Sequence, residues 1–440
     1  MNLPLFLARG VAAGGGPSIS RTILAIAVVA VAISMATMVL ASALVTGFKA
    51  EISDKAFGFW GHIHITEAAA SYGVLDSYNY PISNQQDFYP ALDTLGPITY
   101  DEFGSALVPD AATARTTRGG VRHIQQFIVV PGIVTVYKPE ERLPTAIEGM
   151  ILKGIAEDFD WDNFGKYLVA GEALRISPDS VSRGIVISRQ EADRLQVGLG
   201  DRLDFGYPNS DREERTRAFT VTGIFKTGME EYDRQFALVD IRVPRRLLNW
   251  EPNQVGGFEV FIDDIDDLEA FANYIHYAIP QDLYAESIRR KLSELFQWLD
   301  IQDYNWAIIL TLMVTVAIIN MMTALLILIL ERTNMIGTLK ALGQSNWSIR
   351  QIFLYYAGFI VVIGLLLGNG IGLGLAWLQS TFGIVKLDEA NYYLDVAPIQ
   401  VDWFTVVWLN LGTLAVTLLF LVVPSYLVTR IDPVRAIRFQ

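Results

Sequence analysis

Few side chains in this sequence are of the types that carry out catalysis. The 440 residues include no cysteine and only four histidines. His62 and His64 would share one face of a strand, because side chains alternate along a strand, but no third metal ligand is evident. A Gly-x4-Gly-Lys-Ser/Thr loop, which would surround a phosphate group with N–H groups and a lysine, is missing too. The sequence therefore predicts no catalytic residue, no metal site, no bound cofactor and no ATP hydrolysis by this chain.

One short segment has a pattern suited to binding another protein. Residues 331–343, Glu-Arg-Thr-Asn-Met-Ile-Gly-Thr-Leu-Lys-Ala-Leu-Gly, have helical propensity and lie between two long apolar runs. Its apolar stripe would be Met335, Ile336, Leu339 and Leu342, with Arg332 and Lys340 at the sides. Such a stripe fits a groove on a soluble partner, and a helix lying flat on lipid is the alternative.

The elements around this segment are predicted to be membrane spans. Four runs contain no charged residue and no histidine: 22–48, 304–330, 351–385 and 403–429. About 20 apolar residues at 1.5 Å rise cross a hydrocarbon core of about 30 Å, so each run is long enough. The rival interpretation, buried helices of a soluble protein, is disfavoured because such helices seldom run this far without one charge.

The distribution of basic residues predicts which side of the membrane each segment occupies. The basic residues flanking the four runs are Arg9, Arg21, Arg332, Lys340, Arg350, Arg430, Arg435 and Arg438. Basic residues favour the cytoplasmic side, so both termini and the 331–350 segment are expected there. The excess of acidic residues then belongs to the outside. Leu3, Leu5, Phe6 and Leu7 suggest a short interfacial helix before the first span.

The outer segment between the first two spans reads as a mixed α and β domain. Short β-branched runs at 62–66, 126–130, 184–188, 219–225 and 258–262 predict strands. A helix over 188–195 follows from a capping-box pattern in which Ser188 precedes Glu191 by three residues. Leucine and isoleucine spacing over about 283–303 predicts an amphipathic stalk helix that runs into the second span. Such a helix could carry motion, or it could simply pack.

Polar groups inside the spans argue against ion-coupled transport. No ionisable residue lies within any span, whereas proton-coupled and ion-coupled carriers place such groups near mid-membrane. Asn320 and Asn369 are expected to form hydrogen bonds between helices. Gly364, Gly368 and Gly372 recur every four residues, which predicts close helix packing.

Several motifs resemble one family of permeases over the whole chain. Glu331-Arg-Thr, Ile336-Gly and Lys340-Ala-Leu-Gly343 resemble the cytoplasmic coupling helix of the lipoprotein-releasing (Lol), macrolide-exporter (MacB) and FtsX-like ABC transporter permeases. Pro424 and Ile431-Asp-Pro-Val-Arg-Ala-Ile-Arg438 resemble the C-terminal ending of the same group. Further motifs resemble the lipoprotein-releasing branch: Gly200-Asp-Arg-Leu203, Val221 to Asp233, Leu152 to Asp160, and Tyr392 to Pro398. Met335 departs from the acidic residue of many relatives, and 206–215 is shorter than the carrier-capturing hook of one lipoprotein-releasing paralogue.

The resemblance implies a non-catalytic subunit of an ATP-driven complex. It would work as a pair with a second copy or a paralogue, bind a cytoplasmic ABC ATPase dimer that holds ATP and Mg, and contact membrane lipid. Its substrate would be a lipoprotein, passed to a periplasmic carrier, and no nucleic acid partner is expected. The residues that would couple to the ATPase are Glu331, Arg332, Thr333, Met335, Ile336, Gly337, Leu339, Lys340, Leu342 and Gly343. Candidate lining of a substrate cavity, which could equally face lipid or pack, is Val39, Ala43, Phe48, Trp306, Ile309, Met313, Tyr392 and Tyr393.

Taken together, the expected fold is an α-helical integral membrane protein of four transmembrane helices with a large α+β periplasmic domain between helices 1 and 2. The expected parts are a cytoplasmic N-terminus 1–21, spans 22–48, 304–330, 351–378 and 403–429, a domain 49–303, a coupling helix 331–350, a periplasmic loop 379–402 and a cytoplasmic tail 430–440. The expected function is lipoprotein release at the bacterial inner membrane. The alternatives are export of peptides or drugs, and regulation of a periplasmic cell-wall hydrolase.

Overall fold

The structure is a computed structural model that divides the chain into two compact units. It describes residues 19–70, 76–101, 114–137, 144–208, 214–388, 392 and 394–431. The helical unit contains 1–51, 298–386 and 396–440, and the α/β unit contains 52–297 and 387–395. The expected interfacial helix before residue 19, the middle of the 206–215 segment and the tail beyond Ile431 lie outside the described residues.

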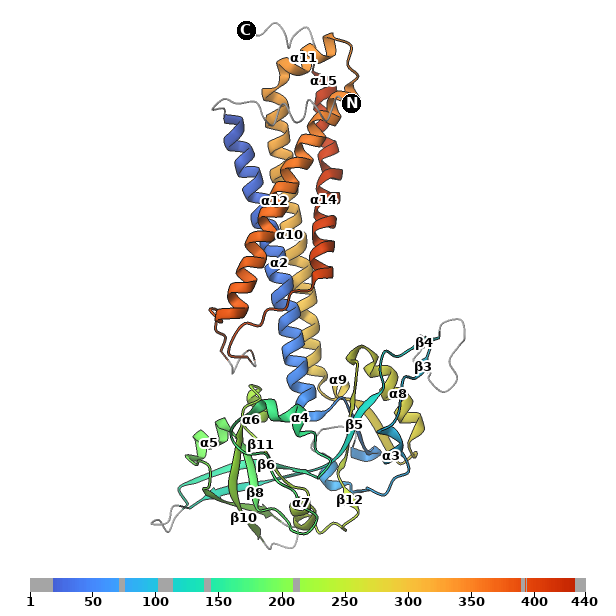
Figure 1. Ribbon diagram of the computed structural model, residues 1–440, viewed down its shortest axis with the longest axis vertical. Helices are drawn as coiled ribbons and strands as arrows, with labels where there is room; N and C mark the ends of the chain where they lie inside the picture. The colour runs from blue at the N-terminus through green and yellow to red at the C-terminus, as the bar shows by residue number, and fades with distance from the viewer. Residues whose placement is uncertain are drawn as a thin grey trace. The chain divides into compact units, whose positions relative to one another are not determined.

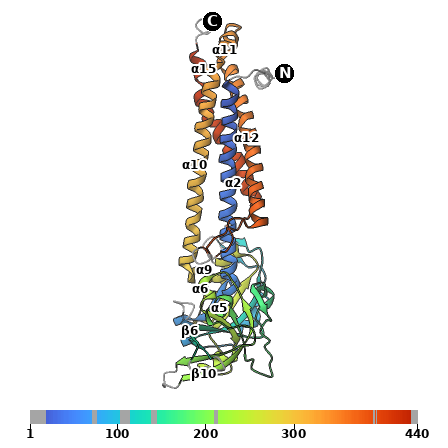
Figure 2. The same ribbon diagram turned by 90° about the vertical axis from the view of Figure 1, so that its left-hand side faces the viewer.

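The helical unit is built from four long apolar helices that lie side by side (Figures 1 and 2). They are α2 (Ile19–Trp60), α10 (Ser293–Glu331), α12 (Asn346–Phe382) and α14 (Trp403–Ser425). Two short helices accompany them, α11 (Thr333–Ala341) and α15 (Leu427–Arg430). Each long helix, the last one extended by α15, is apolar enough and long enough to cross a membrane, which confirms four candidate spans.

Small residues let α12 approach α2 closely. A Cβ added to Gly368 would lie 2.6 Å from the Cβ of Met35, and one added to Gly364 would lie 2.8 Å from the Cβ of Val31. No side chain fits in that space, so the two helices are in backbone contact there. The predicted packing role of the recurring glycines is confirmed.

An asparagine pair joins α12 to α14. Asn369 Nδ2 donates to Asn410 Oδ1 at 2.7 Å, and Asn410 Nδ2 donates back to Asn369 Oδ1 at 3.1 Å. Reciprocal amide bonds of this kind satisfy polar groups that lipid cannot. The prediction for Asn369 is confirmed, whereas Asn320, half-buried on α10, makes no side-chain hydrogen bond to any residue that the structure describes.

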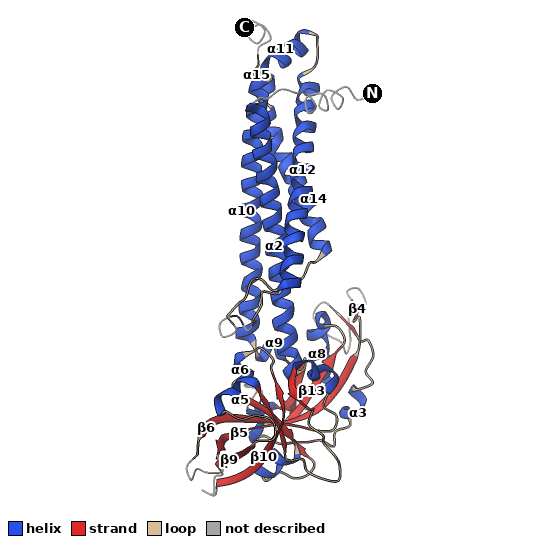
Figure 3. Ribbon diagram, turned by 60° about the vertical axis from the view of Figure 1, so that its left-hand side comes forward, coloured by secondary structure: helices blue, strands red, loops and turns tan. Residues whose placement is uncertain are grey.

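The α/β unit contains the strands and most of the short helices, as the colouring of Figure 3 shows. The strands are β1 (Ile63–Glu67), β2 (Ile82–Ser83), β3 (Thr99–Tyr100), β4 (Arg115–Thr116), β5 (Val121–Val136), β6 (Ala146–Ile155), β7 (Leu168–Gly171), β8 (Gly184–Ser188), β9 (Arg202–Pro208), β10 (Glu214–Phe225), β11 (Phe236–Asp240), β12 (Gln254–Val255), β13 (Gly257–Ile262) and β14 (Leu283–Ser287). The α-helices are α3 (Phe88–Leu92), α4 (Trp161–Phe164), α5 (Arg189–Leu195), α6 (Glu230–Asp233), α7 (Arg242–Leu247), α8 (Leu268–Ala278) and α9 (Ile288–Lys291). Single 3₁₀ turns are η1 (Ala68–Ala70), η2 (Asp76–Asn79), η3 (Gly165–Tyr167) and η4 (Ile265–Asp267).

Ten strands form one mixed sheet in this unit. Its order is β14-β1-β13-β5-β6-β11-β8-β10-β7, and β9 pairs with both β10 and β5. The β8–β10 and β6–β11 pairs are parallel and the other pairs are antiparallel. The long strand β5 pairs with β13 along one half and with β9 along the other, so it joins two parts of the sheet.

The strands and the short helix expected from the sequence are present. All five predicted runs fall on β1, β5, β8, β10 and β13. Ser188 is the N-cap of α5 and accepts a hydrogen bond from the backbone N–H of Glu191 at 2.9 Å, as the capping pattern predicts.

The predicted stalk helix begins later than expected. Leu283–Ser287 is the edge strand β14 and pairs with β1, and the long helix α10 starts at Ser293 after the short α9. Buried and half-buried residues alternate along β14, which is the period of a strand. The prediction of one helix over 283–303 was therefore wrong for Leu283–Ser287, and the helix that follows is interrupted at Leu292 between α9 and α10.

Part of the expected loop 379–402 belongs to the α/β unit. Helix α12 continues to Phe382, and residues 387–395 then group with the α/β unit. Lys226 Nζ lies 2.9 Å from an Asp395 carboxylate oxygen, an ion pair that joins the loop to the end of β10. This segment is therefore held by residues of the unit rather than being a simple connection.

Candidate functional site

The segment proposed to contact a partner is not one continuous helix. Helix α10 ends at Glu331, α11 covers Thr333–Ala341, and α12 begins at Asn346. Between the last two, Gly343 has a φ of +86°, a conformation that favours glycine. The expected helix over 331–350 is corrected to a short helix, a glycine turn and the first turn of α12.

The apolar stripe of this segment is divided between the inside and the outside of the helical unit. Ile336 is completely buried in the apolar core, and Met335 and Leu339 pack against the same core. Leu342 is 76% exposed. Among the other candidate contact residues Glu331 and Gly343 are exposed, Arg332, Thr333 and Lys340 are half-buried, and Gly337 is buried. A partner can therefore reach the turn after α11 more readily than the stripe, and contact with an ATPase stays a prediction.

Lys340 is engaged within the chain. Its Nζ donates to the backbone carbonyl of Ile431 at 2.8 Å and lies 3.3 Å from that of Thr429. Both carbonyls lie at the end of α15, where a helix has no N–H groups of its own left to offer them. The sequence predicts Lys340 at the side of a partner-binding stripe. Spacing along a helix cannot reveal its contact with a carbonyl 91 residues further along the chain.

The candidate cavity residues do not come together as one site. Val39 and Ala43 are buried in the helical unit, and Val39 faces Gly372 of α12. Phe48 packs edge-on against Trp298, with ring centroids 5.4 Å apart. Ile309 and Met313 are half-buried on α10, Tyr392 is exposed in the segment of the α/β unit, and Tyr393 lies outside the described residues. A substrate cavity lined by this set stays a prediction.

An apolar groove lies between α10 and α14 instead. It has a volume of about 560 Å³, within the range of ligand pockets. Its walls include Trp306, Leu310, Thr311, Val314, Thr315 and Ile318 from α10 and Phe404, Trp408, Gly412, Thr413, Val416 and Phe420 from α14. Thr311 and Thr315 donate their hydroxyls to carbonyls one turn back in α10, at 2.8 Å and 2.7 Å, so these side chains present methyl groups to the groove. Of the predicted cavity residues, Trp306 lines this groove.

The groove residues were missed because the sequence signals them weakly. Trp408 and Phe420 are exposed apolar residues of a span, which is also the pattern of ordinary lipid-facing positions. Gly412 is the one usable signal, because a missing side chain opens space between aromatic neighbours. Pairing α14 with α10 requires the three-dimensional fold.

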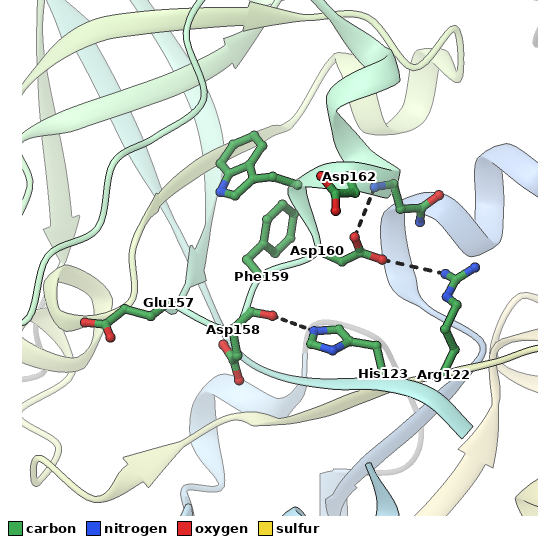
Figure 4. A pocket seen from close by; sticks show the side chains of 9 residues that line it. Arg122, His123, Glu157, Asp158, Phe159, Asp160 and Asp162 are labelled. Carbon is green, nitrogen blue, oxygen red and sulfur yellow. Dashed lines mark hydrogen bonds and ion pairs between the residues drawn. The ribbon is translucent and has the colours of Figure 1, made fainter. Parts of the chain in front are cut away.

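The α/β unit has a larger but polar pocket of about 760 Å³, shown in Figure 4. Arg122 and His123 of β5 form one wall, and the acidic run 157–163 forms the other. Asp160 caps α4 by accepting the backbone N–H three residues on, and it lies 3.7 Å from the Arg122 guanidinium. His123 is bonded to the Asp158 carbonyl at 2.5 Å. These contacts explain much of the charge structurally, and no metal-binding cluster of three ligands occurs among the residues that the structure describes.

A fully buried ionic cluster lies where α2 ends inside the α/β unit. Lys153 of β6 lies 2.7 Å from the Glu259 carboxylate of β13 and donates to the carbonyl of Phe59 at 2.5 Å. His64 Nε2 donates to the carbonyl of Trp60 at 2.8 Å. Both carbonyls belong to the last turn of α2, where a positive charge complements the helix dipole. The charged Lys153 of β6 and the His64 ring of β1 thus fix the end of α2 to the sheet.

The electrostatics of this cluster follow from burial. Burial alone would raise the pKa of Glu259, but the charge of Lys153 together with the hydrogen bonds from His64 and Lys153 outweighs it and holds that pKa below its ordinary value. Burial lowers the pKa of His64 and of His62 to about 4, so both histidines are neutral at pH 7. His62 Nδ1 accepts the backbone N–H of Ile262 at 2.8 Å, which also requires an unprotonated nitrogen. The two histidines therefore have structural roles, and no cluster of three metal ligands includes them among the residues that the structure describes.

Two family models match this chain. Residues 24–276 match the MacB-like periplasmic core domain, and residues 307–433 match the C-terminal domain of FtsX-like permeases. The first match covers more than half of the chain, and the two together include α12 and α14 and most of α2 and α10.

Curated relatives are similar over about two thirds of the chain. The lipoprotein-releasing system transmembrane protein LolC of Xylella fastidiosa is 25% identical over 292 residues, which are 62% of this chain and 70% of the relative. LolC of Neisseria meningitidis is 24% identical over 310 residues, 67% of this chain and 74% of the relative. The related protein LolE of Haemophilus influenzae is 23% identical over 271 residues, 58% of this chain and 64% of the relative.

Proposed function

Because this chain belongs to the family with the MacB-like periplasmic core domain and carries the FtsX-like permease C-terminal domain, we propose that it is the permease subunit of a lipoprotein-releasing complex. The chain is an ABC transporter permease of the multi-pass membrane type. In the proposed complex it extracts lipoproteins from the bacterial inner membrane and releases them toward the outer membrane. The energy comes from ATP hydrolysis in a separate ATPase.

The observation that carries this proposal is the similarity to LolC over 292 residues. This matched length is greater than that of the α/β unit or of the helical unit alone. The energetics support a need for ATP. Extracting an acyl chain costs about 0.8 kcal/mol for each buried CH2, so a lipoprotein with two or three chains does not leave the membrane spontaneously. A chain with no evident nucleotide site would have to obtain this energy from a partner.

The exposed turn after α11 is the proposed binding surface for that ATPase. Leu342 is 76% exposed and Trp347 is 55% exposed, so two large apolar side chains are available for burial against a partner. In the proposed orientation this turn and both termini are cytoplasmic, in agreement with the basic residues around it. Two permeases, identical or paralogous, would share one ATPase dimer.

The α10–α14 groove supports contact with acyl chains. Its walls are mainly aromatic and aliphatic, Thr311 and Thr315 are satisfied within α10, and no charged residue is among its lining residues. A chain leaving the lipid phase would lose little on entering such a surface. We propose this groove, which Trp306 lines, as the first place to look for bound lipid.

Depletion of the protein tests the proposal. Cells depleted of this chain would be fractionated into inner and outer membranes, and acylated lipoproteins would be located by labelling their acyl chains. Accumulation in the inner membrane is the expected result. Normal sorting of lipoproteins would overturn the lipoprotein function and leave the ABC permease assignment intact.

Photo-crosslinking distinguishes the alternative functions. A photoreactive residue at Trp408 in the groove should capture lipidated protein, and the same residue at Trp377, which is exposed on α12, serves as a control for general lipid contact. Capture of unlipidated peptides at Trp408 would favour an exporter. Capture of a cell-wall hydrolase by a further photoreactive residue placed in the α/β unit, with no capture at Trp408, would favour a regulator.

A further inference from the structure

The last membrane helix breaks just before its end. Pro424 lies in the final turn of α14, where it has no N–H to donate, and α14 stops at Ser425. The chain then continues as the separate single turn α15, Leu427–Arg430. A break of this kind leaves backbone carbonyls without helix partners on both sides.

Two cations from elsewhere in the chain bind on either side of this break. Before it, Arg350 of α12 donates from Nε to Ser425 Oγ at 3.0 Å, and its guanidinium lies 3.8 Å above the ring of Tyr426. After it, Lys340 of α11 donates to the Ile431 carbonyl at 2.8 Å. Arg350 is 93% buried, so its charge is not engaged with solvent.

Apolar packing surrounds these two contacts. Leu421 and Val428, one on each side of the break, are completely buried in the core that also holds Ile336 of α11 and Ile349 of α12. Apolar contact is non-directional and would allow the end of the helix to slide. Directional hydrogen bonds from Lys340 and Arg350 select one position for it.

We infer that Lys340 and Arg350 are positioning residues that join residues 425–431 to the segment 333–350 as one body. We call these contacts of Lys340 and Arg350 with residues 425–431 the latch. Through the latch, the end of the last span becomes part of the segment proposed to contact the ATPase. A displacement of α11 then moves α14 as well as α10 and α12, the two helices that precede and follow α11 in the chain. The latch itself rests on contacts within this chain, and only its use in coupling rests on the proposed function.

The absence of cysteine in the sequence allows a direct test in the full chain. Leu342 and Arg430 are both exposed, so each would be replaced by cysteine and spin-labelled in lipid nanodiscs. The distance distribution between the labels should be narrow in the parent chain and broad in Lys340→Met and in Lys340→Met with Arg350→Met. Amide exchange at 427–431 should rise about tenfold, because charge-assisted hydrogen bonds to these carbonyls are lost.

Three further variants keep the test decisive. Lys340→Arg keeps a cationic donor and should restore the narrow distribution. Lys49→Met removes a half-buried cation from the same unit, where its Nζ lies 2.7 Å from Asp303, and should leave the labels and the exchange unchanged. Lys340→Met alone serves if the double variant does not fold, since Lys340 is only half-buried. Unchanged distances and exchange in folded Lys340→Met would overturn the latch.

The role in coupling has a separate readout. With the partner ATPase present, Lys340→Met should release less lipoprotein for each ATP hydrolysed than the parent chain does, and Lys340→Arg should recover this ratio. Equal ratios in both variants would overturn the coupling role even if the labels report a latch. A latch seen by the labels in a chain that does not sort lipoproteins at all would instead count against the proposed function.

Discussion

At the scale of single residues, the buried histidines should make stability depend on pH. His62 and His64 have pKa values of about 4 in the folded chain, against 6.5 when unfolded. The unfolded chain therefore binds more protons between these values. Their contribution is complete above pH 6.5 and is lost as the pH falls toward 4, at about 1.4 kcal/mol per histidine for each pH unit in that window.

Denaturant unfolding of the full chain at pH 7.5 and pH 5 would measure this loss. Histidine-to-glutamine variants at 62 and 64 should each lose less stability on acidification than the parent chain does. Comparing variant with parent removes the effect of other titrating groups, including Glu191, whose pKa burial raises to about 7. Equal losses in parent and variants would show that the two histidines are not held neutral.

The Lys153–Glu259 pair should be sensitive to removal of one partner. Lys153→Met leaves the Glu259 carboxylate buried without its cation, and this should cost about 3–5 kcal/mol in the free energy of unfolding. Lys166, which pairs with Asp54 at the surface, is the matched control, and Lys166→Met should cost about 1 kcal/mol or less.

Chemical denaturation of the two lysine variants tests the difference. A double variant, Lys153→Met with Glu259→Leu, should recover part of the loss because no unpaired charge remains buried. A cost below about 1 kcal/mol for Lys153→Met would contradict a desolvated ion pair.

At the scale of elements, the face of α12 that meets α2 should tolerate no added side chain. Gly368→Ala places a Cβ 2.6 Å from Ala32 O and from Met35 Cβ, so the helices must separate, at a cost of about 1–3 kcal/mol. Gly370→Ala is the matched control, because no atom lies within 4 Å of its added Cβ.

Thermal unfolding in detergent compares the two glycine variants. Gly370→Ala should stay within about 0.5 kcal/mol of the parent chain, or gain slightly from the better helix propensity of alanine. Two equally mild variants would mean that α2 and α12 are not in contact at Gly368.

Elements were predictable where one local signal decides them. The charge-free runs gave the four long helices, and the Ser188 and Glu191 pattern gave α5 with its cap. The edge strand β14 was mistaken for a helix because an apolar Leu283 fits the spacing of a helix as well as that of a strand, and only pairing with β1 distinguishes the two structures. The spacing of apolar residues along a segment indicates its own period. It contains no information on which strand, more than 200 residues away, the segment pairs with.

The candidate site was less predictable for the same reason. The sequence singled out the 331–343 segment, but it could not show that Ile336 points into the core while Leu342 points out. Both are apolar and six residues apart, so the glycine turn at 343 and the packing of α11 decide their exposure. The Lys340 contact depends on where α15 ends, which lies far along the chain.

At the scale of the whole molecule, the exposed turn after α11 should decide partner binding. Leu342→Glu should reduce the ATPase activity that copurifies with the tagged chain about tenfold or more, if Leu342 fills a pocket on the ATPase. Val385→Glu, which changes an exposed residue just beyond α12, is the control and should copurify normally.

The copurification result also bears on orientation. If copurifying ATPase activity is lost in Leu342→Glu but not in Val385→Glu, the turn lies on the side of the membrane that holds the ATPase, which is the cytoplasm. Loss in neither variant would show that the partner contacts another surface. Both variants must reach the membrane in equal amounts for the comparison to hold.

The ion pair between Lys226 and Asp395 has a consequence for synthesis. The two residues are 169 positions apart, and two membrane helices are made between Gln297 and Leu387. At roughly 5–20 residues per second, the ribosome needs roughly ten to thirty seconds to progress from one to the other. During that interval the newborn α/β unit lacks its final segment, so a chaperone or a neighbouring nascent chain can reach a surface that the finished protein covers.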